Sequence, residues 1–136
     1  MYTKILVAYD ESPGGRAALD RAEALAKPLG AALTLIRAVG EGRLSVGAKP
    51  DTIAAARTAL QREIARYRPD LDAELWVVGM PASGSILAAA SEMEADLIVT
   101  GSRHRGTVRR TFLGSVSSDL IHQAPCDVLV VHPIED

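Results

Sequence analysis

The stretch from Thr100 to Ser117, TGSRHRGTVRRTFLGSVS, gathers residue types that bind phosphate. It holds three glycines, five arginine or histidine side chains, and a Gly-Ser pair where a helix is expected to begin. Glycine lets a backbone approach a ligand closely, and a helix start attracts anions through its free N–H groups and positive dipole end. Ser115 and Ser117 carry hydroxyls that can donate to phosphate oxygens. The stretch therefore predicts a phosphate-binding loop, with a plain helix cap and a solvated basic face as the alternative.

Asp10 is a second candidate for chemistry because it directly follows the apolar run ILVAY. A carboxylate at this place can help to start the next helix, or it can hold a ribose hydroxyl, a metal ion or a phosphoryl group. A receiver-type phosphoacceptor domain would also need an aspartate after the third strand and a lysine after the fifth. The sequence has Val78-Gly79 and His132-Pro133 there, which excludes that class.

Other catalytic and cofactor motifs are missing from the sequence. No GxxxxGK[ST] occurs, and DESPGG stands where a dinucleotide-binding GxGxxG would follow the first strand. His104, His122 and His132 are too dispersed to predict a metal site with Cys126, which we interpret as a small buried residue entering the last strand. Spacing alone supports no Ser-His-Asp grouping.

Composition predicts one domain over residues 1–136, with 48% hydrophobic and 24% charged residues. A net charge of −2 argues against a nucleic-acid binder held by bulk charge. No run approaches the ~18 apolar residues of a membrane span, and no signal peptide is visible. The single cysteine, Cys126, fits a reducing compartment. We therefore expect a cytoplasmic protein with neither nucleic acid nor membrane as its partner.

Short apolar runs predict five strands, at residues 5–9, 32–39, 73–78, 96–100 and 127–132. Apolar residues three or four apart predict a helix between each pair of strands, the last at residues 115–124, and residues 40–50 are expected to form a loop. Ser12 and Pro13 are typical of a helix cap and first helical position. Pro28 and Gly30 are expected to close that helix, and Ser83 to cap the third.

Regular alternation of strands and helices is typical of an α/β fold in which helices sandwich a parallel sheet. Right-handed crossovers restrict the topology to a few doubly wound arrangements. In such sheets, ligands bind beyond the carboxyl ends of the strands, where the strand order reverses. Asp10, Ala38, Gly79 and Gly101 fall at these ends, and Gly101 is expected to turn the chain after the fourth strand.

Five segments together resemble the universal stress protein family over nearly the whole chain: KILVAYDES, GMP, ADLIVTGSR, RTFLGSVSSDLI and QAPCDVLVVHP. The resemblance implies an open five-stranded parallel sheet of order 3-2-1-4-5 with helices on both faces, the adenine nucleotide alpha hydrolase-like fold. It also implies a homodimer through strand five, from Asp127 to His132. Such pairing is physically sensible because an apolar edge strand invites another strand.

The nucleotide-binding members of this family share the motif G-x2-G-x9-G-[ST] after strand four. Gly101, Gly114 and Ser115 match it, whereas His104 stands at the second glycine. By resemblance, Asp10 meets the ribose or adenine side, and Ala8 and Ala38 form part of an adenine pocket. Thr100 and Gly101 line the nucleotide, and four residues hold the phosphates: Gly114, Ser115, Val116 and Ser117.

His104 is the departure on which nucleotide binding depends. Losing one backbone contact costs about 1 kcal/mol, which weakens binding roughly tenfold without abolishing it, and an imidazole can itself donate to phosphate. The favoured function is a stress-response regulator that binds ATP, with or without Mg²⁺, and senses it without rapid turnover. A nucleotide-free dimeric interaction module and a slow ATP hydrolase remain as alternatives. No general base or magnesium-binding carboxylate pair stands out near the loop, so we expect no enzyme.

Overall fold

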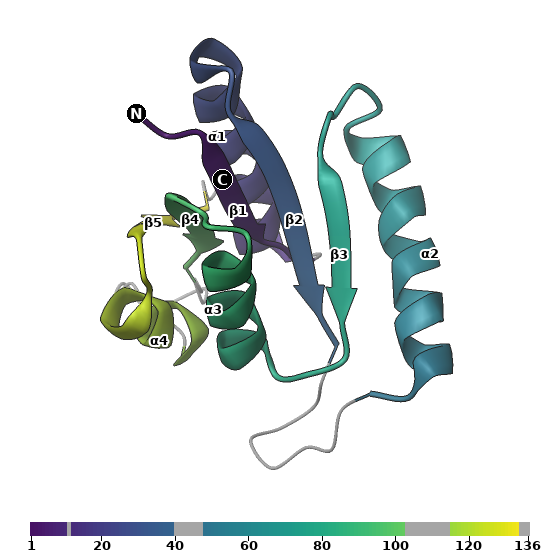
Figure 1. Cartoon of the computed structure of the whole chain (residues 1–136). Coiled ribbons are helices and arrows are strands. Elements are labelled where there is room, and N and C mark those ends of the chain that lie inside the picture. Colours follow the sequence, from purple (N-terminus) through teal and green to yellow (C-terminus); the bar gives the residue numbers. More distant parts are fainter. Residues whose placement is uncertain (11, 40–47, 103–114, 134–136) are drawn as a thin grey trace, which may run out of the picture.

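The computed structural model describes residues 1–10, 12–39, 48–102 and 115–133. Strands and helices alternate along these residues, as the apolar runs predicted (Figure 1). The strands are β1 (Lys4–Ala8), β2 (Ala32–Ala38), β3 (Glu74–Val78), β4 (Leu97–Gly101) and β5 (Asp127–Val131). The helices are α1 (Pro13–Leu29), α2 (Pro50–Tyr67), α3 (Ala82–Glu92) and α4 (Ser115–Gln123).

All five strands form one parallel sheet in the order β3-β2-β1-β4-β5, which confirms the predicted topology. The chain builds outward from β1 through β2 to β3, then crosses to the other side of β1 to form β4 and β5. Val7 of β1 is aligned with Leu35 of β2 and with Val99 of β4. The order reverses between β1 and β4, and such a reversal leaves a crevice at the carboxyl ends of the strands.

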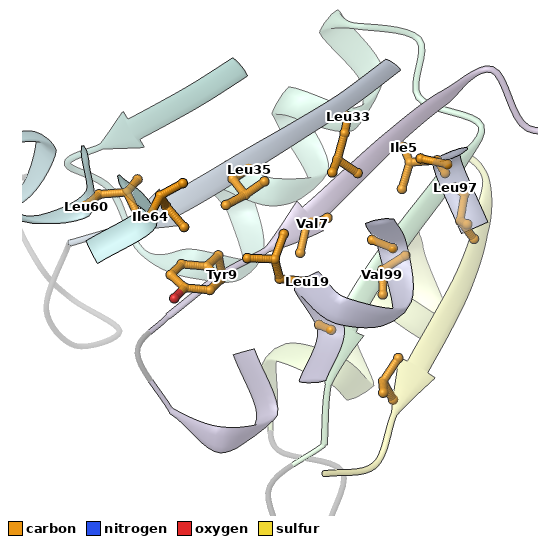
Figure 2. Close-up of a cluster of buried hydrophobic side chains, with 14 of the residues drawn as sticks. Ile5, Val7, Tyr9, Leu19, Leu33, Leu35, Leu60, Ile64, Leu97 and Val99 are labelled. Atoms are coloured by element: carbon orange, nitrogen blue, oxygen red, sulfur yellow. The ribbon is translucent and has the colours of Figure 1, made fainter. Parts of the chain in front are cut away.

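Each face of the sheet is covered by two helices, so β1 is buried on both sides. Ile5 and Val7 pack in one core with residues of α1 and α2, among them Leu19 and Leu60 (Figure 2). Leu6 packs in a second core with residues of α3 and α4. Burial on both faces explains why the strand reads as an unbroken apolar run instead of an alternating one.

Helix α1 begins and ends at residues that the sequence singled out, with one correction. The Oγ atom of Ser12 accepts a hydrogen bond from the Gly15 N–H at 3.1 Å, and Pro13 is the first helical residue. Gly30 ends the helix in the left-handed conformation, with φ of 64°. The expectation that Pro28 helps to close the helix is wrong, because Pro28 lies inside its last turn and the left-handed glycine terminates it.

Ser83 does not cap α3, contrary to the sequence-based expectation. The helix begins at Ala82 after an extended Pro81, and its start has no side-chain cap. The Ser83 hydroxyl instead donates to Oδ2 of Asp119 at 2.8 Å. Ser83 therefore joins α3 to α4, a contact between residues far apart in the sequence.

The start of α1 lies directly against the end of β4. Gly101, which was expected to turn the chain, is instead the last residue of β4. A Cβ atom added to Gly101 would lie 2.1 Å from the carbonyl oxygen of Gly14, and one added to Gly14 would lie 2.7 Å from the carbonyl oxygen of Ser102. Both positions therefore require glycine because backbone packs on backbone.

We predict that Gly101→Ala lowers the free energy of unfolding by about 1–3 kcal/mol or more, because neither backbone can yield to the added methyl group. Gly84→Ala is the matched control. Gly84 lies in α3 with no atom within 4 Å of an added Cβ. That variant should gain roughly 0.5–1 kcal/mol from the lower backbone entropy of alanine. Urea denaturation measures both, and equal effects of the two substitutions would contradict the close contact.

Candidate functional site

A cavity of about 540 Å³ opens at the carboxyl ends of β1, β2 and β4. Helices α1 and α4 contribute their first turns to it, and α3 contributes Ala82 and Ile86. Its volume is within the range of pockets that hold small ligands. The cavity lies where the strand order reverses, as the doubly wound topology requires of a binding crevice.

Most residues predicted for the site line this one cavity. They come from strand ends and from the first turn of α4: Ala8, Asp10, Ala38, Thr100, Gly101, Val116 and Ser117. Ser115 is the first residue of α4 but is exposed and does not line the cavity. His104 and Gly114 lie outside the described residues. Gly79 follows the edge strand β3 and does not line the cavity, and its carbonyl oxygen accepts the Ala48 N–H at 2.6 Å.

One part of the cavity is apolar and shaped by small side chains. Ala8 is aligned with Ile36 on the neighbouring strand, and both pack in the core beneath α3. Ala38 is the last residue of β2, two residues beyond Ile36, and it also lines the cavity. Ile86 of α3 completes this apolar part of the lining. Two alanines in place of larger residues leave room for a flat apolar group between the strand ends and the helix.

The opposite part is polar and is formed by β4 and two helix starts. Thr100 and Ser102 are buried there, at 4% and 3% exposure. The Ser117 hydroxyl donates to the carbonyl oxygen of Gly101 at 3.2 Å, so its proton is engaged within the protein. The unpaired N–H groups of a helix start then remain as the donors for an anion. This half of the cavity is thus suited to negative charge.

Asp10 is held in place by the start of α1. Its Oδ1 atom accepts the backbone N–H of Ser12 at 3.0 Å and also the Ser12 hydroxyl. A Cβ atom added to Gly15 would lie 2.5 Å from the same oxygen, so glycine is needed beside the carboxylate. Asp10 therefore takes the helix-starting role that the sequence left open, and its carboxylate borders the cavity as well.

Sequence reasoning missed several residues that build the site. Gly14 and Gly15 bring α1 close to β4 and to Asp10, and the two adjacent glycines at a helix start were the available signal. Ser102 shares a 2.8 Å hydrogen bond with Nδ1 of His132 and donates its N–H to Val131, also at 2.8 Å. These bonds join the ends of β4 and β5, and no local pattern indicates them.

Tyr9 is another lining residue that the sequence did not single out for the site. Its ring is buried in the core (Figure 2). Its hydroxyl donates to Oε2 of Glu63 at 2.8 Å. Burial raises the pKa of Tyr9 far above its ordinary value, and the hydrogen bond to Glu63 raises it further. Arg16 pairs with the other oxygen of Glu63 at 3.0 Å. The phenol therefore stays protonated and ties β1 to α2.

Cys126 is half-buried and precedes β5, so its interpretation as a buried residue was only partly correct. Burial raises the pKa of its thiol. Within residues 1–10, 12–39, 48–102 and 115–133, no three His, Cys, Asp or Glu side chains gather as a metal site would need. Among the helices described, none is long and apolar enough to cross a membrane.

The open parallel sheet and the cavity at its reversal point define a doubly wound α/β protein with a ligand crevice at the strand ends. The sequence model of the universal stress protein family matches residues 1–132. The chain is also 36% identical to a universal stress protein of Thermus aquaticus, with 96% of this chain and 99% of that protein covered. It therefore belongs to the universal stress protein family, as its sequence motifs predicted.

Solved structures of similar proteins have the same fold, the adenine nucleotide alpha hydrolase-like fold. One is the universal stress protein from Archaeoglobus fulgidus in complex with dAMP, which is 28% identical, with a TM-score of 0.67 and coverage of 96% of this chain and 98% of that one. Another is a universal stress protein in complex with cAMP, 26% identical, with a TM-score of 0.68 and 98% of both chains covered.

Proposed function

We propose that the carboxyl-end cavity binds an adenine nucleotide, ATP, and that the protein is a regulator of the stress response. The observation that carries this proposal is that the predicted residues come together in space. Seven residues predicted for nucleotide binding, distant in sequence, line one cavity where the strand order reverses. Complexes of similar proteins with dAMP and cAMP support an adenylate as the ligand.

The cavity's two halves suggest how the nucleotide lies. The adenine ring would occupy the apolar part beside Ala8 and Ala38, with the ribose near Asp10. The phosphates would then lie near Gly101 and the start of α4, where Val116 lines the cavity. A Mg²⁺ ion that accompanies ATP would neutralise phosphate charge, and we assign it no protein ligand.

We further propose that the protein senses ATP and does not turn it over rapidly. Among the described residues, Asp10 is the carboxylate that lines the cavity, and its Oδ1 already accepts two hydrogen bonds from Ser12. A carboxylate engaged in this way is a poor general base for a water molecule. We place the protein in the cytoplasm, where ATP is available and a lone half-buried Cys126 stays reduced.

Val116 provides a charge test of the phosphate position, because it stands in the first turn of α4 and lines the cavity. Val116→Glu should weaken ATP binding about tenfold or more, since a carboxylate would face the phosphates. Val116→Gln introduces a side chain of nearly the same shape as glutamate but without the charge. Its ATP affinity should stay within about threefold of that of the natural protein. Isothermal titration calorimetry measures all three, and equal losses in both variants would place the phosphates elsewhere.

The alternative of a nucleotide-free module makes an opposite prediction at His104. If the natural protein gives no heat at millimolar ATP and copurifies with no adenine nucleotide, the ATP proposal fails. His104→Gly, which restores the family's glycine, should then create ATP affinity. If the natural protein does bind ATP, the same substitution should strengthen binding by about tenfold.

The alternative of a slow hydrolase is tested by turnover. Phosphate release from ATP should match a protein-free blank, because no poised general base faces the ligand among the described residues of the cavity. Release well above that blank, which disappears in the Val116→Glu variant, would show that the cavity is an enzyme active site. That outcome would be compatible with ATP binding in the cavity and would contradict only the proposal that the protein senses ATP without turning it over.

We also propose a homodimer through β5. This strand pairs only with β4 among the described strands, and three successive apolar side chains, Val128, Leu129 and Val130, are only partly buried. Leu129 and Val128 pack against opposite cores, whereas Val130 packs against neither. The free edge and the uncovered Val130 are the features of a strand that a second copy covers.

Val130→Lys should therefore shift a dimer toward monomer, because a lysine in an apolar contact must lose its hydration. Met80→Lys is the control, since Met80 is 54% exposed and lies at the other end of the sheet, after β3. Size-exclusion chromatography with light scattering gives the mass of each. A monomeric natural protein at micromolar concentration, or dissociation by both lysines alike, would contradict the β5 dimer.

A further inference from the structure

One short segment of chain, the junction between β1 and α1, supplies much of the lining of the carboxyl-end cavity. Its described residues, 10 and 12–15, all line the cavity: Asp10, Ser12, Pro13, Gly14 and Gly15. Tyr9 comes directly before this junction and Arg16 directly after it. The side chains of both bind the same residue of α2, Glu63. A single carboxylate therefore joins the two ends of the junction.

Glu63 uses one carboxylate oxygen for each end of the junction. Its Oε2 atom accepts the Tyr9 hydroxyl at 2.8 Å, and its Oε1 atom accepts an N–H of Arg16 Nη2 at 3.0 Å. Tyr9 is 3% exposed and the side chain of Glu63 is 17% exposed, so water competes little for the carboxylate. Hydrogen bonds to a charged group are stronger than those between neutral groups, and both of these bonds are of that kind.

The packing of α2 holds Glu63 in this place. Leu60 and Ile64, on the same turn of the helix, are buried at 3% and 7% exposure. Both belong to the core that contains Tyr9 (Figure 2). The carboxylate cannot leave the junction without drawing these apolar side chains out of the core. Glu63 therefore has the fixed base that a side chain needs in order to position another group.

The position of the Asp10 carboxylate depends on the shape of the junction. Its Oδ1 atom accepts the Ser12 N–H at 3.0 Å, and the Oγ atom of Ser12 in turn accepts the Gly15 N–H at 3.1 Å. A Cβ atom added to Gly15 would lie 2.5 Å from the same Oδ1 atom, so this end of the junction packs against the carboxylate. The Oδ2 atom of Asp10 accepts no hydrogen bond from the described residues and is the oxygen open to a ligand.

We propose that Glu63 is a positioning residue of the carboxyl-end cavity. By holding Tyr9 and Arg16, it keeps Asp10 where the Oδ2 atom can accept the hydroxyls of a nucleotide ribose. Recognition of the ribose then depends on a residue of α2 that does not itself line the cavity. The inference rests on the proposed nucleotide site for its ligand, whereas the restraint on the junction is a property of the free protein.

Comparison of ATP with 2′,3′-dideoxy-ATP tests the ribose contact, because the two nucleotides differ only in the ribose hydroxyls. The natural protein should bind dideoxy-ATP about tenfold more weakly than ATP. Glu63→Ala should weaken ATP binding about three- to tenfold and leave dideoxy-ATP within about twofold, so that the preference is lost. Isothermal titration calorimetry measures each affinity. Equal weakening of both nucleotides in Glu63→Ala, or equal binding of both by the natural protein, would overturn the proposal.

Asp20→Ala is the matched control. Asp20 of α1, like Glu63, accepts a tyrosine hydroxyl and pairs with an arginine; these partners are Tyr67, at 3.1 Å, and Arg68, both at the end of α2. None of the three lines the cavity, so this variant loosens the same two helices without touching the junction and should keep the preference for ATP. Glu63→Gln, which keeps the side-chain volume and one acceptor oxygen, should retain part of it. An equal loss of the preference in Asp20→Ala and Glu63→Ala would overturn the assignment.

Hydrogen exchange, measured by NMR, tests the restraint without any nucleotide. The Gly15 N–H is bonded within the junction, so its exchange rate reports how firmly the junction is held. Glu63→Ala should speed this exchange about tenfold or more relative to the Leu6 N–H in the buried centre of β1, whereas Asp20→Ala should not. If the natural protein binds no ATP, the proposed function fails, and this exchange alone decides whether Glu63 positions the junction. An unchanged rate at Gly15 in Glu63→Ala would overturn the proposal.

Discussion

The contact between the start of α1 and the end of β4 is the constraint on which the site depends. Gly14 and Gly101 bring two backbones closer than any side chain would allow. That approach holds the start of α1 at the reversal point of the sheet, where the Ser12 N–H donates to the carboxylate of Asp10. The cavity therefore owes part of its shape to missing side chains, and its polar lining includes the side chains of Asp10, Thr100 and Ser102 beside the two helix starts.

The cavity joins an apolar and a polar environment at the carboxyl ends of the strands. Small apolar side chains line the cavity at the strand ends, among them Ala8, which packs against the core beneath α3, and Ala38. The other side is made of helix starts and buried hydroxyls such as Thr100. A ligand with a flat apolar part and an anionic part matches that division, which is why an adenylate suits the cavity better than a purely polar or purely apolar molecule.

Most of the fold could be predicted from the sequence because strands buried on both faces leave unbroken apolar runs, and helices leave three- and four-residue spacing. The site residues at strand ends followed from the topology. What could not be predicted depends on contacts across long separations. The bond of Ser83 to Asp119 and that of Ser102 to His132 span 36 and 30 residues. Local rules instead assigned Ser83 to a helix cap and Gly101 to a turn.

The hydrogen bond between Ser102 and His132 has a thermodynamic consequence. Ser102 lines the cavity, and His132 follows the edge strand through which two copies are proposed to pair. If two copies pair through β5 as proposed, a ligand that favoured one arrangement of this bond would change the free energy of strand pairing, and pairing would change ligand affinity by the same factor. The occupancy of the cavity and the assembly of the protein would then report on one coupled equilibrium.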